Sequence, residues 1–270
     1  MQSLVPHEET RRRTAKVVAA SLLIPGLGHL LCERRRWALF WFLLCQGLLI
    51  TGFVLAGSTQ LDFGRWFGFG GAKMLFVCLP EIGNIGGTQL VARMYHSIEN
   101  GGLSPVVLPW RHLGYLLSGA SGVLSCWAAA HAASAQMDKD EPLPTGRISP
   151  GNATLAALLF PGLGHWLSGR RFKAVFMGGT VFMMFVLGMA LGDFSDLERA
   201  RHPYYWGGQM LGGPMVWLTS LAVATRRFTE VLPFQDAGLL FTTTAGMFQA
   251  ILALDVFHRS QHDWLEEARK

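Results

Sequence analysis

Long apolar stretches recur along the chain at lengths typical of membrane spans. A run of about 20 apolar residues is long enough to cross the hydrocarbon core of a bilayer. Such runs occupy Trp37–Gly57, Lys73–Ala92, Leu113–Ala135, Ala174–Gly192, Gly207–Thr225 and Ala237–His258, and shorter ones occupy Val17–Leu31 and Ala153–Ser168. The pattern predicts an all-α integral membrane protein, a helical bundle of six to eight membrane segments.

The two shorter segments carry the same motif. Pro25-Gly26-Leu27-Gly28-His29 returns 136 residues later as Pro161-Gly162-Leu163-Gly164-His165. A second match has an offset of 124 residues and pairs Gly114, Ser118 and Gly122 with Gly238, Thr242 and Gly246. Self-similarity at a fixed offset indicates repeat architecture. We therefore expect a bundle built from two tandem repeats.

These matches divide the chain. We expect a basic N-terminal tail at 1–16, a first membrane repeat at 17–135, a linker at 136–152, a second membrane repeat at 153–258 and an amphipathic C-terminal tail at 259–270. Half of the residues are hydrophobic, 15% are charged and the mean hydropathy is +0.30. So many long uncharged stretches disfavour a soluble domain.

Loop charges predict an orientation. The cations cluster at Arg34–Arg36, Arg93 with Arg111, Arg170–Lys173 and Arg226–Arg227, and the acids at Asp62, Asp138–Glu141 and Asp193–Glu198. The positive-inside rule places the basic set in the cytoplasm and the acidic set opposite. A 15-residue helix at Val17–Leu31 spans about 22 Å, less than a core of about 30 Å. A re-entrant path for this segment therefore stays open beside a full span.

The repeated motif has two interpretations. Pro25 and Pro161 break their helices, and the glycines Gly26, Gly28, Gly162 and Gly164 permit close backbone approach. One interpretation is a helix-turn-helix corner, with histidine capping the turn and arginine marking the cytoplasmic edge. The other is a site for lipid headgroups or an anionic ligand. Its candidate residues are His29, Arg34, Arg35, His165, Arg170 and Arg171.

The run from Pro161 to Arg171, Pro-Gly-Leu-Gly-His-Trp-Leu-Ser-Gly-Arg-Arg, resembles the TM-two (two-transmembrane-helix) domain superfamily. The first copy departs from it, with Cys32-Glu33 where the second has Ser168-Gly169. The duplicated arrangement also resembles a bacterial family of multi-span membrane proteins of unassigned function. The resemblance implies the architecture and implies no catalytic residue.

Glu81 is an ionisable residue within an apolar segment. Such residues are costly at membrane depth and usually face a bundle interior. With Asn84 one turn further on, Glu81 is a candidate intramembrane polar site. It could handle protons or be a hydrogen-bonded structural acid, and both readings stay open.

Cofactor chemistry has weak support in the sequence. His29, His165 and His131 lie in apolar segments, and paired histidines can hold haem b in helical bundles, so haem stays an outside possibility. No His/Cys/Glu cluster has metal-ligand spacing, so no metal site is expected. The four cysteines have no paired spacing.

Three classes of function remain. We expect a non-catalytic integral membrane subunit, scaffold or assembly factor, because no catalytic motif stands out. A small-molecule or ion transporter that uses broken helices and Glu81 is the alternative, and a haem- or quinone-binding respiratory subunit is the second alternative. The net charge of +5 sits at span ends. It therefore points to membrane lipids, not nucleic acid, beside other membrane subunits as partners, in a bacterial inner membrane.

Overall fold

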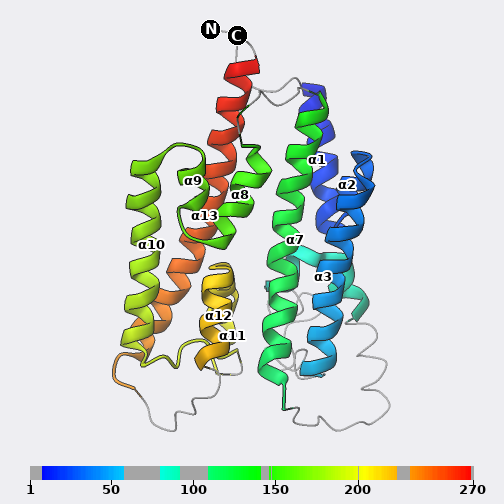
Figure 1. Cartoon of the computed structure of the whole chain (residues 1–270). Coiled ribbons are helices and arrows are strands. Elements are labelled where there is room, and N and C mark those ends of the chain that lie inside the picture. Colours follow the sequence, from blue (N-terminus) through cyan, green and yellow to red (C-terminus); the bar gives the residue numbers. More distant parts are fainter. Residues whose placement is uncertain are drawn as a thin grey trace.

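The computed structural model describes residues 8–57, 80–91, 109–140, 146, 148–199, 201–223 and 232–268, and every regular element in these ranges is helical. Four helices are long and apolar enough to cross a membrane (Figure 1): α3 (Arg35–Ala56), α7 (Arg111–Asp140), α10 (Arg171–Leu191) and α13 (Gln235–Ala268). The all-α class and the presence of membrane-length helices are thus confirmed.

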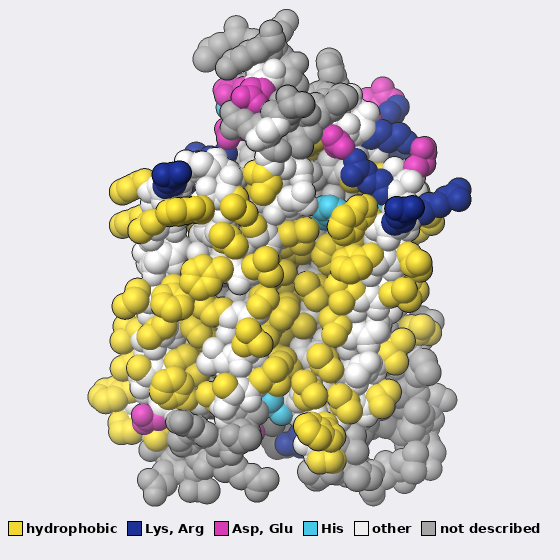
Figure 2. Space-filling view, viewed as in Figure 1, with side chains coloured by type: hydrophobic (Ala, Val, Ile, Leu, Met, Phe, Trp, Pro, Cys, Tyr) yellow, Lys and Arg dark blue, Asp and Glu magenta, His cyan; other side chains and the backbone are white. Residues whose placement is uncertain are grey.

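The surface has the polarity that a bilayer requires. Apolar side chains cover the middle of the face in Figure 2, and charged side chains gather at the end where Figure 1 places both termini. Large apolar residues along the long helices are exposed, among them Leu39 at 59%, Val175 at 64% and Leu254 at 70%. Water would disfavour so wide an apolar belt. The four long helices and this belt are consistent with an integral membrane protein.

Helix α7 is the most enclosed of the long helices. In its most apolar window 72% of the residues are buried, compared with 33% in α3 and in α10. Small residues explain the close packing, since Gly52 of α3 faces Gly114 and Ser118 of α7. A β-carbon at Gly52 would lie 2.6 Å from the Ser118 nitrogen. Small faces of this kind let membrane helices approach at backbone distance.

The first repeated motif forms a re-entrant hairpin. Helix α1 (Glu8–Leu23) leads into a turn at Gly26, whose φ of 90° is left-handed, and α2 (Leu27–Leu31) returns. Both ends of the hairpin reach the same end of α7, because Arg13 lies 3.6 Å from Asp140 and Lys139 lies 2.8 Å from Glu33. The segment Val17–Leu31 therefore enters and leaves on one side. Helix α1 also includes residues 8–16, which belong to the predicted N-terminal tail.

The second motif repeats this path. Helix α8 (Pro150–Leu159) is capped by the Ser149 hydroxyl, which accepts from the Asn152 N–H at 3.2 Å. The chain turns at Gly162, with φ 83°, into α9 (Leu163–Leu167). Gly146 and Ile148, just before α8, line one cavity together with Ser168 and Gly169, just after α9. Both ends of this hairpin therefore also lie on one side of the molecule (Figure 1).

Two segments predicted as spans are interrupted. Gly207–Thr225 is not one helix, because α11 (Pro203–Met210) and α12 (Pro214–Val223) are separated by a turn with Gly213 at φ 69°. Glycine accepts that conformation and proline then starts the next helix. In Lys73–Ala92 a 3₁₀ helix, η1 (Pro80–Asn84), precedes a helical stretch at 85–91. The other residues of that segment, 73–79 and 92, lie outside the described ranges.

The tips of the two motif hairpins are covered by other parts of the chain inside the bundle. A β-carbon at Gly213, in the α11–α12 turn, would lie 2.6 Å from the carbonyl oxygen of Leu158 in α8. Gly86 makes the corresponding approach to the carbonyl of Leu23 at the end of α1. Irregular backbone is tolerated at membrane depth where protein covers it. The motif hairpins are covered in this way.

The predicted separation of basic and acidic loops is wrong where the structure describes it, and Asp62, Arg93, Glu141 and Arg226–Arg227 lie outside the described residues. Arg34 forms a hydrogen-bonded ion pair with Asp138, so these expected opposites share one end of the molecule. Arg111 begins α7, and Asp138 lies near its other end. The error arose because hairpin segments were counted as full spans, and each miscounted span reverses the side of the loops that follow.

The C-terminal ends of α7 and α13 extend past the predicted boundaries of the membrane segments. Helix α7 continues to Asp140, into the expected linker. Helix α13 continues to Ala268, so residues 259–268 prolong a long helix. The ion pair of Arg259 with Asp255, at 3.0 Å, lies along this extension. An i,i+4 pair of this kind adds modest support to an exposed helix.

The close approach at the motif glycines gives a first prediction. A β-carbon at Gly28 would overlap the Ser21 hydroxyl and the Val17 carbonyl, whereas one at Gly47 has nothing within 4 Å. We expect Gly28→Ala to lower stability by about 1–3 kcal/mol through overpacking. Gly47→Ala is the matched control and should be neutral or stabilising, because alanine favours a helix. Melting temperatures in detergent measure both, and equal melting of the two variants would contradict the packing argument.

Candidate functional site

A fully buried ion pair lies between segments far apart in the sequence. The Arg199 guanidinium Nη1 donates to Glu81 Oε1 at 2.7 Å, and the two side chains are 1% and 0% exposed. The Ser118 hydroxyl donates to the same oxygen at 2.8 Å. The Arg199 guanidinium also lies over the Tyr115 ring, 5.2 Å from its centroid. One carboxylate and one guanidinium thus share a compact, dehydrated site.

The backbone positions this site through a glycine. Gly122 of α7 has no side chain, and a β-carbon there would lie 2.5 Å from the Glu81 Cα and would overlap the Pro80 carbonyl. Helix η1 can therefore rest directly on α7, one turn from Ser118. Arg199 lies shortly before α11, so the second half of the chain supplies the cation.

Because the pair is buried, its stability depends on its geometry and on its other hydrogen bonds. Taking two charges out of water is costly, and the cost is recovered only with good geometry and further hydrogen bonds. Glu81 Oε1 has two donors, whereas Oε2 has no hydrogen-bond partner among the described residues. Sequence reasoning identified Glu81 but missed Arg199, because Arg199 follows an acidic loop and has no spacing relation to Glu81.

Asn84 belongs to a neighbouring network. Its side-chain oxygen accepts from Gln46 Nε2 at 2.9 Å and from the Gly87 N–H at 3.3 Å, and its Nδ2 donates to Ser121 at 3.2 Å. These bonds tie η1 to α3 and to α7. Glu81 and Asn84 are thus both buried as expected, and their side chains serve different partners.

A second acid is buried in the other half. Asp196 is 0% exposed, and neither carboxylate oxygen has a hydrogen-bond partner within the described ranges. Its carboxylate fills the space between Gly192 and Gly238. Burial raises the pKa of Asp196 from 3.8 to about 7, because desolvation penalises the charged form. Gln209 holds the segment by donating to the Asp196 carbonyl at 3.3 Å and to Thr242 at 2.9 Å.

The motif histidines lie in the interior of the bundle. His29 is 0% exposed, and its Nε2 lies 2.8 Å from Nδ1 of His131 in α7. The Trp41 indole N–H donates to the same His131 nitrogen at 3.3 Å. In this arrangement the histidines do not fit bis-His ligation of haem, because a direct hydrogen bond leaves no room for iron and its macrocycle between the rings.

The second motif histidine meets a carboxylate. His165 is 0% exposed, and its Nε2 lies 3.1 Å from Asp255 of α13, which also pairs with Lys173. No haem partner for His165 is found in the described part of the chain. The two motif histidines therefore join their hairpins to the long helices α7 and α13.

The candidate arginines separate into two kinds. Arg34 pairs with Asp138, and Arg170 pairs with Asp263 at 2.5 Å. Arg35 and Arg171 are exposed and form no ion pair in the described ranges. Pro25, Gly26, Pro161 and Gly162 are buried at the hairpin turns, and Gly28 and Gly164 are buried beside them. The expected headgroup contact stays a prediction, and Arg35 and Arg171 are the candidates with exposed side chains and no ion pair in the described ranges.

One group of side chains could approach a metal ion. His262, Asp263 and Glu266 bring their ligand atoms within 4.8 Å of one another near the end of α13. Asp263 already pairs with Arg170, and His262 lies 3.7 Å from Glu266. This i, i+1, i+4 cluster was not singled out in the sequence, and its internal pairing explains it without a metal.

The buried pair gives a second prediction. Glu81→Leu removes the carboxylate that balances the buried charge of Arg199, so we expect a loss of about 3–5 kcal/mol of stability. The double variant Glu81→Leu with Arg199→Met removes both charges and should recover most of the loss. Detergent melting of the wild type, both single variants and the double variant forms a complete cycle. Additive single effects would contradict direct coupling of the two residues.

Asp196 gives a third prediction. Because its pKa is raised from 3.8 to about 7, the folded state binds the proton more tightly, and stability falls as pH rises through that window. Asp196→Asn lacks this slope, so its melting temperature should exceed that of the wild type by more at about pH 8 than at about pH 5. Asp193→Asn, at an exposed position in the same loop, is the control and should show the same slope as the wild type. Parallel pH curves for Asp196→Asn and the wild type would refute a neutral buried acid.

Part of the chain matches a protein family of unknown function. A family model described as "Family of unknown function (DUF6677)" matches residues 152–266, the part of the chain from α8 to near the end of α13. No curated protein and no solved structure matches the chain. The second half of this chain is thus similar to a family whose function is unassigned.

Proposed function

We propose that this protein is a non-catalytic integral membrane subunit, scaffold or assembly factor. The observation that carries the proposal is the Glu81–Arg199 pair, which is 0% and 1% exposed and joins the two halves of the chain. Separating the halves would strand a charge at membrane depth, which costs several kcal/mol. A body locked in this way suits a rigid membrane component that presents its outer surface to partners.

We further propose that the bundle consists of two tandem repeats, as the TM-two resemblance implies. Support comes from contacts that recur at the offsets of the sequence matches. Gly26 packs on the Ala38 carbonyl, and Gly162 packs on the Ala174 carbonyl. Gly52 packs on the Ser118 nitrogen, and Gly188 packs on the Thr242 nitrogen. Repeated local contacts of this kind are expected when a duplicated segment keeps its fold.

The polar sites also correspond. Glu81 lies beside Gly122 and accepts from Ser118, and Gln209 lies beside Gly246 and donates to Thr242. Glu81 and Gln209 are 128 residues apart, so the counterpart of Glu81 is Gln209 and not Trp217, which a constant offset of 136 would give. The second repeat thus has a neutral amide where the first has a carboxylate.

The motif histidines follow the same correspondence. His29 contacts His131, and the Trp37 ring lies edge-on to His131 with centroids 4.8 Å apart. At the corresponding positions His165 and Lys173 both contact Asp255. An aromatic cluster in one repeat is therefore matched by an ionic cluster in the other, at the same offsets of 136 and 124 residues.

Charge supports a location in the cytoplasmic membrane of a bacterium, with both described ends of the chain in the cytoplasm. Figure 1 places α1, the starts of α3 and α10 and the ends of α7 and α13 toward the end of the bundle that has both termini. By their helix bounds these parts carry Arg11, Arg12, Arg13, Lys16, Arg34, Arg35, Arg36, Lys139, Arg170, Arg171, Lys173 and Arg259. The described residues at the opposite end include Arg111, Arg199 and Arg201. The positive-inside rule then orients the bundle. Labelling of a single cysteine at Glu33 from outside the cell would reverse this orientation.

The outer surface suits lipids and other membrane subunits as partners. Exposed aromatic and aliphatic side chains lie on the long helices and on α12, among them Phe172 at 84% and Leu218 at 67%. Aromatic side chains are enriched in interfaces between proteins and at membrane interfaces.

A proton-coupled transporter is the second candidate. Its support is the contact of the two motif hairpins with interrupted helical segments inside the bundle, at Gly86 with Leu23 and at Gly213 with Leu158. Discontinuous helices in corresponding positions of two halves mark binding sites in many transporters. The buried carboxyl of Asp196 could take up a proton near neutral pH.

A flux measurement separates the two candidates and is the fourth prediction. We expect purified wild-type protein in proteoliposomes to pass no more protons than empty liposomes under an imposed pH gradient with potassium and valinomycin. The same protein purified gently from native membranes should migrate with a stoichiometric partner. A proton flux in the wild type that is lost in both Glu81→Gln and Asp196→Asn would overturn the scaffold proposal. Loss in neither variant would point to leakage, which a matched unrelated membrane protein controls.

A further inference from the structure

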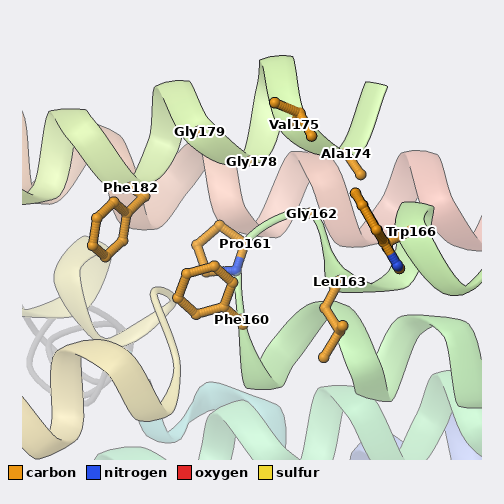
Figure 3. Close-up of a pocket in the computed structure, with 10 residues that line it drawn as sticks. All are labelled: Phe160, Pro161, Gly162, Leu163, Trp166, Ala174, Val175, Gly178, Gly179 and Phe182. Carbon is orange, nitrogen blue, oxygen red and sulfur yellow. The ribbon is translucent and has the colours of Figure 1, made fainter. Parts of the chain in front are cut away.

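A groove lies on the outer surface between the second re-entrant hairpin and α10 (Figure 3). Its volume is about 390 Å3. It is lined by Phe160, Pro161, Gly162, Leu163, Trp166, Ala174, Val175, Gly178, Gly179 and Phe182. All these residues are apolar apart from the Trp166 indole N–H. Phe160, Trp166 and Val175 are 47%, 48% and 64% exposed, so the groove opens to the surroundings of the bundle.

Two adjacent glycines create the space. Gly178 is needed for packing, because its β-carbon would lie 2.6 Å from the Pro161 carbonyl oxygen. Gly179 is not needed for packing, because a β-carbon there would meet nothing within 4 Å. At the positions 136 residues earlier the chain has Phe42 and Leu43. The groove thus depends on a difference between the two halves, and Gly179 leaves it open without serving the fold.

One end of the groove carries an available cation. Arg171 is exposed, forms no ion pair in the described ranges, and has its guanidinium 5.7 Å from the centroid of the Trp166 ring. Its neighbour Arg170 is engaged with Asp263. Arg171 begins α10, and Ala174 to Phe182 follow along the groove. A positive charge therefore lies at one end of the apolar groove.

The lining of the groove indicates its occupant. From Ala174 to Phe182 it follows eight residues of helix, which is about 12 Å. An apolar groove of this length suits a flexible hydrocarbon chain, because such a chain has no polar backbone groups that need hydrogen-bond partners. An anionic group attached to such a chain would lie beside Arg171.

We propose that this groove binds one anionic phospholipid, with an acyl chain along Gly178 and Gly179 and the phosphate on Arg171. The acyl chain packs into the groove, where the apolar lining surrounds it. The charge of Arg171 selects an anionic headgroup. Trp166 separates the two regions, as aromatic rings do at membrane interfaces. This site is independent of the scaffold proposal, because neither Glu81 nor Arg199 contributes to it.

Two variants test the site in the full-length protein. Gly179→Leu installs the side chain found at Leu43 and fills the groove, and Gly47→Leu is its matched control, since Gly47 also has open space around it. Arg171→Gln removes the charge, and Arg35→Gln removes the corresponding charge of the first half. Detergent melting shows that each variant remains folded. The probes are phosphatidylglycerol and phosphatidylcholine with identical acyl chains, and bound lipid is counted by native mass spectrometry.

The expected pattern is specific. Wild type, Gly47→Leu and Arg35→Gln retain one phosphatidylglycerol with a preference of about fivefold over phosphatidylcholine, as one cation near anionic lipid provides. Arg171→Gln loses the preference and keeps the lipid, and Gly179→Leu loses both. Retained binding in Gly179→Leu, or an unchanged preference in Arg171→Gln, would overturn the proposal. Displacement by inorganic phosphate alone would assign the site to a free anion, and a peptide found in the groove would assign it to a protein partner.

Discussion

The ion pair of Glu81 and Arg199 is the interaction on which the arrangement of the bundle depends. It brings η1 and the segment shortly before α11 to the same point beside α7, with both side chains at 1% exposure or less. The attraction between charges rises steeply as the surroundings lose water. The pair therefore resists separation, and Ser118 and Tyr115 hold it from the α7 side. The pair requires glycine at position 122, since any side chain there would push η1 away from α7.

The re-entrant hairpins meet a second constraint, the need to satisfy backbone groups in a medium without water. Each hairpin is too short to cross alone, and each turns at a glycine in the left-handed conformation, at φ 90° for Gly26 and 83° for Gly162. Their buried histidines then join α7 and α13. Turn, helix end and long helix are thus linked, which explains why the Pro-Gly-Leu-Gly-His motif is kept whole in both halves.

Much of the fold could be predicted from composition and periodicity, because membrane-length apolar runs report directly on spans. The helices α3 and α10 fell within a few residues of Trp37–Gly57 and Ala174–Gly192. Glu81 could also be found, because a carboxylate in an apolar run is conspicuous. Arg199 could not, since its partner is 118 residues away and local sequence contains no trace of that contact. The break at Gly213 was hidden because hydropathy does not distinguish a span from a hairpin.

The separation of 118 residues between the paired charges also has a consequence in time. Synthesis proceeds at about 5–20 residues per second, so Glu81 leaves the ribosome roughly 6–24 s before Arg199. During that interval the first half reaches the membrane with its acid but without the matching cation. The final seat of η1 against α7 can form only when the second half arrives. Folding of the first half is therefore completed by the second, and the order of membrane insertion is built into the placement of two charges.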